Sequence, residues 1–256
     1  MVSLRKLRRP FVVGVVVERA APAAARAAAA AFRDGADTVE LNLASLDGVA
    51  GLGRSFFHGW RKPVYTSYRR PGFMGVYGPK FARLRAVAEA ERMDRQLDLL
   101  RHGSKGLDIE ADTFAPARDE WTLDRAAIRR QCEVAAAAHR RGATVIFSWH
   151  PSRKVTGAEA LRVVRALHRR GADFVKIVER VRSRAEALDS LGISLHLAEK
   201  SPVPFVFLAL GAEAVRFRPY VTAFGAAYLL ARPPIGSNRL TAQPLVARAR
   251  ALLDLA

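Results

Sequence analysis

The chain has 256 residues, 50% of them hydrophobic, and its 42 Lys and Arg residues outnumber the 24 Asp and Glu residues, giving a formal net charge of +18. This length suits one large domain with a substantial core, although two small domains would also fit. The single cysteine, Cys132, excludes a disulfide framework and a thiolate metal site. It favours a reducing compartment, so we expect a cytoplasmic protein.

The positive charge would suit a nucleic-acid binder. However, the Lys and Arg residues are spread over many predicted helices, and no group of aromatic residues is interleaved with them, as a base-stacking surface would need. We therefore interpret the charge as a solvated surface that also attracts anionic substrates, and we do not expect nucleic acid to be a partner.

The N-terminal segment superficially resembles a secretory signal, because basic residues at 5–9 precede an apolar run at 11–17. Glu18 and Arg19 end that run after about seven residues, which is short for a signal. A first strand followed by a first helix explains the segment better. No segment approaches the roughly 20 apolar residues of a membrane span.

One short pattern occurs three times, at residues 33–39, 140–145 and 169–175. In each case basic residues end an Ala-, Arg- and Leu-rich helical pattern, a glycine follows, and an apolar run begins. This is the helix-to-strand junction of a repeating βα protein.

Eight short apolar runs predict strands and alternate with helical patterns over most of the chain. The gap after the second strand is Gly-rich and poorly helical, and the gap after the seventh is short. This alternation predicts one α/β domain, a (β/α)₈ TIM barrel spanning residues 1–256. The predicted strands are residues 11–17, 38–43, 64–68, 107–111, 144–149, 174–178, 205–210 and 220–226, and the clearest predicted helices are 22–33, 80–102, 123–141, 158–170, 182–200 and 244–255.

Lys176 interrupts the apolar run at residues 174–178. A buried ammonium loses solvation, and this is how proteins make an amine nucleophilic enough to form a Schiff base with a carbonyl. The alternative is an ion pair inside the barrel, with Glu110 or Glu40.

One element upstream, the apolar run at residues 144–149 ends on His150, a side chain suited to moving protons near neutral pH. The alternative is that His150 only ends the strand before Pro151. An amine nucleophile and a proton shuttle at the ends of successive strands predict a site for carbonyl chemistry.

Other polar residues at strand ends are candidates with structural alternatives. Glu40 alternates with apolar residues and should point into the barrel, to bind a hydroxylated substrate or to form an ion pair. Asp108 and Glu110 have the same ambiguity, and we interpret them as structural. Arg218 suits bidentate binding of a carboxylate, although a solvated arginine is the default in so Arg-rich a chain. Ser237 lies in a late loop.

Together these residues resemble the type I 3-dehydroquinate dehydratases, Schiff-base (β/α)₈ enzymes of the shikimate pathway of aromatic amino acid biosynthesis. The strongest part of the resemblance is the histidine segment followed, one βα unit later, by the lysine segment. The resemblance covers almost the whole chain, in Val39-Glu40-Leu41, Lys62-Pro63-Val64-Tyr65-Thr66, Leu107-Asp108-Ile109-Glu110, Val145-Ile146-Phe147-Ser148-Trp149-His150, Ala172-Asp173-Phe174-Val175-Lys176-Ile177 and Phe224-Gly225.

The resemblance implies a lyase without a cofactor or metal that dehydrates 3-dehydroquinate to 3-dehydroshikimate. In the family the lysine forms an imine with the substrate ketone, and the histidine removes the neighbouring proton and then helps water leave. These roles fall on Lys176 and His150. The carboxylate-binding arginine of the family falls on Arg218, between Gly211 and Phe224.

The substrate-binding shell departs from the family pattern. The family usually reads Glu-x-Arg-x-Asp after the second strand, whereas this chain keeps Glu40 and has Asn42 and Ala44 in the other two places. After the third strand the family has Thr-x-Arg and then Glu-Gly-Gly. Here Arg69 replaces that arginine with a shift of one residue, and the glutamate is absent.

The late loop of the family, Ser-x-Pro-Gly-Gln, keeps its serine as Ser237, and its glutamine becomes Thr241 or Gln243. Lys176, His150 and the anion-binding Arg218 thus match the family, whereas the residues expected around the substrate hydroxyls differ from it. The implied substrate-binding set is Glu40, Asn42, Arg69, Arg218, Ser237, Thr241 and Gln243.

Two other functions stay open. The same imine could serve an aldolase-like cleavage of another keto acid, or the barrel could have lost activity and bind anions or nucleic acid. The sequence does not fix the oligomeric state, and a homodimer is one option.

Overall fold

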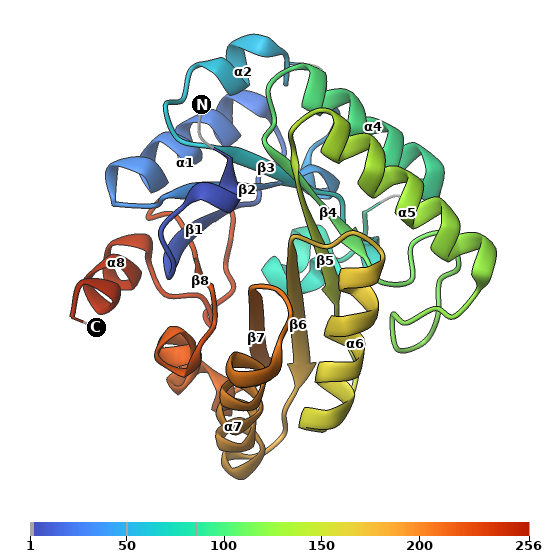
Figure 1. Ribbon diagram of the computed structural model, residues 1–256. Helices are drawn as coiled ribbons and strands as arrows, with labels where there is room; N and C mark the ends of the chain where they lie inside the picture. Colours follow the sequence, from blue (N-terminus) through green and yellow to red (C-terminus); the bar gives the residue numbers. More distant parts are fainter. Residues whose placement is uncertain (1–2, 50, 85, 256) are drawn as a thin grey trace.

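The computed structural model describes residues 3–49, 51–84 and 86–255. Eight parallel strands form one sheet in the order β7-β6-β5-β4-β3-β2-β1-β8, which curls into a nearly closed barrel with the helices outside (Figure 1). The predicted (β/α)₈ fold is confirmed. The strands are β1 (Phe11–Val16), β2 (Thr38–Asn42), β3 (Val64–Ser67), β4 (Gly106–Glu110), β5 (Thr144–Trp149), β6 (Phe174–Arg180), β7 (Phe205–Leu210) and β8 (Tyr228–Ala231).

Three helices of the outer layer, α5, α6 and α7, begin at a side-chain cap. Asp124, Thr156 and Ser183 each accept a backbone N–H of the first turn of the helix that follows. In the part of the chain that the structure describes, no helix is both long enough and apolar enough to cross a bilayer. The α-helices are α1 (Ala21–Arg33), α2 (Arg54–His58), α3 (Pro71–Met74), α4 (Glu89–Arg101), α5 (Arg125–Arg140), α6 (Gly157–Arg169), α7 (Arg184–Lys200) and α8 (Val246–Asp254).

Short 3₁₀ helices occupy several connections. The Gly-rich gap after β2 holds one of them together with the short α2, and the segment between β7 and β8 holds two more. The 3₁₀ helices are η1 (Leu4–Lys6), η2 (Leu43–Ser45), η3 (Gly75–Tyr77), η4 (Pro79–Phe81), η5 (Glu213–Arg216) and η6 (Arg218–Phe224).

The eighth strand was predicted in the wrong place. Residues 220–226 belong mostly to η6, which Gly225 ends with a left-handed backbone (φ 92°), and β8 follows it. Pro219 sets the helical backbone angle at the start of η6. A short apolar run is compatible with a strand and with a helical segment, so periodicity alone could not show which of the two residues 220–226 form.

The helix predicted at residues 80–102 is also shorter than expected. Among the described residues of this stretch only α4 is an α-helix, and η4 precedes it. Glu89 and Glu91 lie in the first turn of α4, where negative charge stabilises the positive end of the helix dipole. These two glutamates mark the true start of the helix.

Aromatic rings fill the N-terminal end of the barrel. Phe11 of β1 stacks on Tyr228 of β8 with centroids 5.2 Å apart, and Phe174 of β6 lies 6.0 Å from both. Among the described residues β7 and β8 form no ladder, and the N–H of Ala227 donates to the carbonyl of Phe205 at 2.7 Å. The rings therefore join β6 to β8 across the gap.

Gly14 of β1 lies against α1, and a Cβ there would be 2.7 Å from the Cβ of Ala31. We expect Gly14→Ala to lower the free energy of unfolding by about 1–3 kcal/mol, because the strand and the helix would have to separate. Urea unfolding measures this. Gly48→Ala is the matched control, since a Cβ there meets no atom of the described residues within 4 Å. Equal losses in the two variants would contradict this close packing.

Candidate active site

Lys176 lies near the middle of β6 with its side chain 4% exposed. Its Nζ is 2.7 Å from Oδ2 of Asp108 on β4 and 3.6 Å from Oε2 of Glu40 on β2. Three strands thus bring one amine and two carboxylates together inside the barrel. Opposite charges at these distances offset the desolvation of each group.

Asp108 holds this network together. It accepts hydrogen bonds from Arg69 at 2.5 Å and from Ser148 at 2.6 Å, in addition to contacting Lys176. Burial acts to raise the pKa of Asp108, but the neighbouring Arg69 and Lys176 outweigh it and hold the pKa at about 2. Asp108 is therefore a carboxylate at neutral pH, and two buried cations depend on it.

Glu40 accepts a hydrogen bond from the hydroxyl of Tyr65 at 2.9 Å. Burial is the main cause of the raised pKa of Tyr65, and the charge of Glu40 adds to it. Tyr65 is thus a neutral donor that fixes the carboxylate facing Lys176.

His150 follows β5 and is buried. Its Nδ1 lies 2.7 Å from Oε2 of Glu120, in the loop after β4, and the ring of Phe73 lies 4.5 Å from the imidazole. Burial acts to raise the pKa of Glu120, but the interaction with His150 lowers it overall. A carboxylate at Nδ1 fixes the proton there and leaves Nε2 for chemistry.

The backbone of Glu120 is in the left-handed region (φ 51°), which is costly for a residue with a side chain. Its neighbour Asp119 fastens the loop to the end of β5, because its carbonyl accepts from Nε1 of Trp149 at 2.6 Å and its side chain accepts from Ser152 at 2.9 Å. These contacts hold Glu120 against His150.

Arg218 opens η6 and is 3% exposed. Its Nη1 reaches only the carbonyl of Ala209 at 3.5 Å, and its Nε has no hydrogen-bond partner among the described residues. Burial lowers its pKa to about 10, although Tyr77 opposes this shift. A buried guanidinium without a carboxylate in the described chain suits an anionic ligand.

Other sequence-predicted residues fall into two groups. Asn42 lies inside the barrel end, and its Oδ1 accepts from the N–H of Ala44 while its Nδ2 has no partner among the described residues. The buried hydroxyl of its register partner Ser67 likewise finds no hydrogen-bond partner in the part of the chain that the structure describes. Both could donate hydrogen bonds to a polar ligand.

The three candidates of the loop after β8, Ser237, Thr241 and Gln243, form the second group. Ser237 donates to Glu18 at 2.8 Å and accepts from Lys80 at 2.6 Å. Gln243 is buried and accepts from Asn238, which fastens the loop to β1. Thr241 is exposed, so the structure does not bring it together with the buried site residues.

A segment after β3 covers this end of the barrel. Met74 of α3 and Tyr77 of η3 are buried, and Phe73 lies over Arg69 and His150. The carbonyl of Tyr77 accepts from the N–H of Arg239 at 3.1 Å. The segment therefore joins the loops after β3 and β8 above the buried charges.

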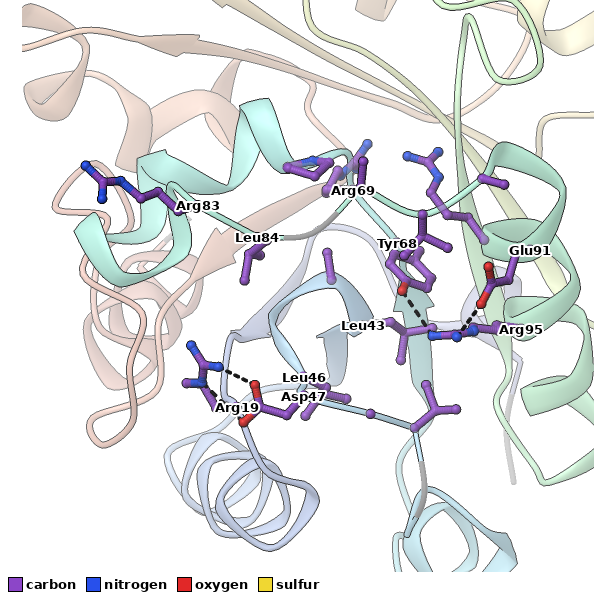
Figure 2. A pocket seen from close by; sticks show the side chains of 18 residues that line it. Arg19, Leu43, Leu46, Asp47, Tyr68, Arg69, Arg83, Leu84, Glu91 and Arg95 are labelled. Carbon is purple, nitrogen blue, oxygen red and sulfur yellow. Dashed lines mark hydrogen bonds and ion pairs between the residues drawn. The ribbon is translucent and has the colours of Figure 1, made fainter.

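A cavity of about 530 Å³ opens beside this covered end, between the loops after β2 and β3 (Figure 2). Arg19 pairs with Asp47 on one wall, and Arg95 pairs with Glu91 and donates to the hydroxyl of Tyr68 on the other. Arg69 also lines the cavity. The cavity thus reaches the arginine that contacts Asp108.

The only ligand atoms suited to a metal that cluster in the described residues belong to Glu110, Glu120 and His150, within 4.8 Å of one another. Two N–H groups of Arg92 already donate to Glu110 at 2.7 Å, and Arg69 lies 3.7 Å from it. Guanidinium groups so close to the carboxylate compete with a metal cation, so this cluster fits an ion-pair network better.

The sequence did not single out Glu120 or Tyr77, and Asp108 was interpreted as structural. Asp108 could have been found from its inward alternation with Glu110 on β4. Glu120 carries no such signal, because it lies in an irregular loop and only the fold brings it to His150.

The fold and this site define an α/β-barrel protein with a buried lysine at its charged centre. The family model for type I 3-dehydroquinase matches residues 11–256, and the chain belongs to that family. No curated protein matches the chain.

Solved structures of 3-dehydroquinate dehydratases share the fold at low sequence identity. The Geobacillus kaustophilus enzyme is 17% identical with a TM-score of 0.79, over 99% of this chain and 95% of that one. The Enterococcus faecalis enzyme is 19% identical with a TM-score of 0.75, over 100% and 99%. The type I enzyme of Clostridium difficile, solved with covalently modified comenic acid, is 16% identical with a TM-score of 0.78, over 99% and 96%.

We expect Asp108→Asn to lower the free energy of unfolding at pH 7 by about 3–5 kcal/mol, because Arg69 and Lys176 lose their shared carboxylate. A lowered pKa stabilises the fold above the unfolded value of about 3.9, and this contribution disappears as the pH falls towards 2. The difference in free energy of unfolding between Asp108→Asn and wild type should therefore shrink as the pH falls from about 3.9 to about 2.

Denaturant unfolding at several pH values measures this difference. Asp98→Asn is the control, because Asp98 is 56% exposed and its ion pairs should contribute little. A loss for Asp108→Asn that stays constant from pH 5 to about pH 2 would contradict the assigned role.

Proposed function

We propose that the protein is a 3-dehydroquinate dehydratase that forms 3-dehydroshikimate through a Schiff base on Lys176. The observation that supports this most is the buried Lys176 on β6, one strand from His150 directly after β5, in a chain of the type I 3-dehydroquinase family. The reaction places the protein in the shikimate pathway as a lyase.

In the proposed first step the amine of Lys176 attacks the C3 ketone, and water leaves as the imine forms. The protonated imine keeps one positive charge at this point. Asp108 and Glu40, which already face the amine, would stabilise that charge without rearrangement. The iminium then withdraws electrons and acidifies the neighbouring C–H bond.

His150 then takes the proton from the carbon beside the imine and later gives a proton to the departing hydroxyl. Glu120 would hold the imidazole in the tautomer that leaves Nε2 free, from 2.7 Å away at Nδ1. Hydrolysis of the product imine regenerates Lys176.

Arg218 would bind the substrate carboxylate, because its buried charge has no carboxylate partner among the described residues. Glu40, Asn42 and Arg69 would orient the hydroxyls from the β2 and β3 sides. Ser237, Thr241 and Gln243 remain candidate ligands, and Ser237 would first have to exchange its bonds with Glu18.

The segment at residues 71–77 would act as a cover that excludes water from the reacting atoms. Phe73 lies over Arg69 and His150 in the structure, and the buried ring of Tyr77 lies 6.2 Å from that of Phe73. Substrate entry would need this segment to move, or would use the cavity that reaches Arg69 from the side.

A second candidate is the same imine chemistry on another keto acid. The observation that favours it is the altered shell, where Asn42 and Ala44 replace an arginine and an aspartate. Each lost hydrogen bond to a substrate hydroxyl would cost on the order of 1 kcal/mol of transition-state binding. The two candidates share Lys176 and differ in the substrate.

Lys176→Met should abolish dehydration of 3-dehydroquinate and leave the fold intact, because Asp108 keeps its bonds to Arg69 and Ser148. Wild type treated with 3-dehydroquinate and borohydride should gain the mass of the reduced adduct on the intact chain, and the variant should not. Activity in Lys176→Met would overturn the proposed function. Trapping without dehydration would favour another keto acid.

Glu120→Gln should lower kcat on the order of 10–100-fold, because the amide no longer fixes the tautomer of His150. Borohydride trapping should persist, since the imine step uses Lys176. Asp119→Asn, which keeps its backbone carbonyl for Trp149, is the matched control on the same loop. Parallel loss of trapping and turnover in Glu120→Gln would point to a structural role instead.

A further inference from the structure

The connection between β4 and α5, residues 111–124, carries Glu120 and is strained in two places. Among the described residues other than glycine, only Phe114 (φ 75°) and Glu120 (φ 51°) have a left-handed backbone. A connection of this length without helix or strand is uncommon in a compact domain and is often functional. Strained residues persist only where their surroundings hold them in place. The contacts that hold this connection therefore determine where the carboxylate of Glu120 lies.

Arg170, the residue that follows α6, is buried against this connection. It is 5% exposed. The equivalent residue after α5, Arg141, is exposed and donates to the carbonyl of Ala137 in its own helix. Burial lowers the pKa of Arg170. Among the described residues its guanidinium donates only to uncharged oxygens, so charge pairing does not explain why it is buried.

The guanidinium of Arg170 reaches both ends of the connection. Its Nη1 donates to the carbonyl of Ala111 at 2.9 Å, and its Nη2 donates to the carbonyl of Thr122 at 2.9 Å. Its Nη1 also donates to Oε1 of Gln131 on α5 at 2.9 Å. Hydrogen bonds from a charged donor are stronger than those between neutral groups. One buried cation thus fastens the start of the connection to its end.

Gln131 extends this attachment along the connection. Its Nε2 donates to the carbonyl of Ala111 at 3.2 Å and to the carbonyl of Thr113 at 2.8 Å. Because Arg170 supplies the donor for Oε1, only one orientation of the amide makes all of these bonds. Arg170 therefore also fixes Gln131, which holds the residue directly before the strained Phe114.

The face of the same guanidinium lies on Trp121, the residue after Glu120. The central carbon of Arg170 is 4.6 Å from the centre of the Trp121 ring. The ring of Trp149, at the end of β5, lies 6.2 Å from that of Trp121. On the other side of Glu120, the carbonyl of Asp119 accepts from Nε1 of Trp149 at 2.6 Å. Both neighbours of Glu120 are thus held, one by β5 and the other by Arg170.

We propose that Arg170 is a positioning residue that acts through Glu120 on the imidazole of His150, a role that rests on the proposed function. The Glu120 carboxylate lies 2.7 Å from Nδ1 of His150, so a shift of about 1 Å in the connection would break that hydrogen bond. The planar fork of arginine suits this place, because it donates to carbonyls in its plane while its face lies on an indole. A lysine would keep the charge but could not make both kinds of contact.

Arg170→Lys tests this role with the charge conserved. We expect kcat for 3-dehydroquinate to fall about tenfold or more, because the carboxylate moves away from the imidazole of His150. Borohydride trapping on Lys176 should persist. Arg250→Lys is the matched control, because Arg250 also donates to a backbone carbonyl, that of Gly35 at 2.8 Å, but at the N-terminal end of the barrel. It should keep the wild-type kcat.

A double-mutant cycle with Glu120→Gln separates positioning from general stability. If Arg170 acts through Glu120, Arg170→Lys should not lower kcat further in the Glu120→Gln background. Gln131→Met, a second variant that leaves Arg170 in place, should show the same dependence with a smaller loss. A wild-type kcat in Arg170→Lys, a full additional loss in the Glu120→Gln background, or an equal loss in Arg250→Lys would each overturn the proposal.

Nitrogen NMR of the His150 imidazole gives a readout that needs no substrate. At a pH where the imidazole is neutral, wild type should carry the proton on Nδ1, and both Arg170→Lys and Glu120→Gln should show a mixture of tautomers. The signals of His150 are assigned by their loss in His150→Gln. An unchanged tautomer in Arg170→Lys would overturn the proposal. A mixture of tautomers there would support it even if wild type failed to trap 3-dehydroquinate, a result that would overturn the proposed function alone.

Discussion

The charged centre of the barrel depends on one constraint, that a buried ammonium needs a carboxylate close by. Lys176 meets it through Asp108, and Asp108 also neutralises Arg69. Moving Asp108 outward would leave Lys176 and Arg69 without the carboxylate that they share, with Glu40 and Glu110 as their next carboxylates at 3.6 and 3.7 Å. The register of β3, β4 and β6 is therefore fixed by electrostatics as well as by apolar packing.

The two ends of the barrel differ in what fills them. Phe11, Phe174 and Tyr228 close the N-terminal end with stacked rings where β7 and β8 do not pair. The C-terminal end holds the buried charges. Because the aromatic rings close the barrel at its N-terminal end, the C-terminal end can carry polar groups that a close-packed core would exclude.

Much of the fold was predictable because its signals are local. Apolar runs, three of them preceded by a helix-ending glycine, predicted seven strands to within about two residues at each end, a margin typical of such boundaries. The eighth failed because residues 220–226 read equally well as a strand and as the 3₁₀ helix that Pro219 begins. Lys176 and His150 were visible as polar residues in or directly after apolar runs, and Glu40 was named as a possible ion-pair partner of Lys176. Glu120, which contacts His150, was not predictable, because it comes from a loop without periodicity.

Glu120 shows why a sequence pattern can miss a carboxylate that the fold brings to a histidine. The family glutamate after the third strand is absent here, yet a carboxylate contacts His150 from the loop after β4. What the imidazole requires is an acceptor at Nδ1, and it does not matter which loop supplies it. The strained backbone of Glu120, fastened through Asp119 to β5, is the structural cost of reaching that position from this loop. A motif search does not find this carboxylate, whereas the geometry places it beside the histidine, and the proposed proton transfer depends on the geometry.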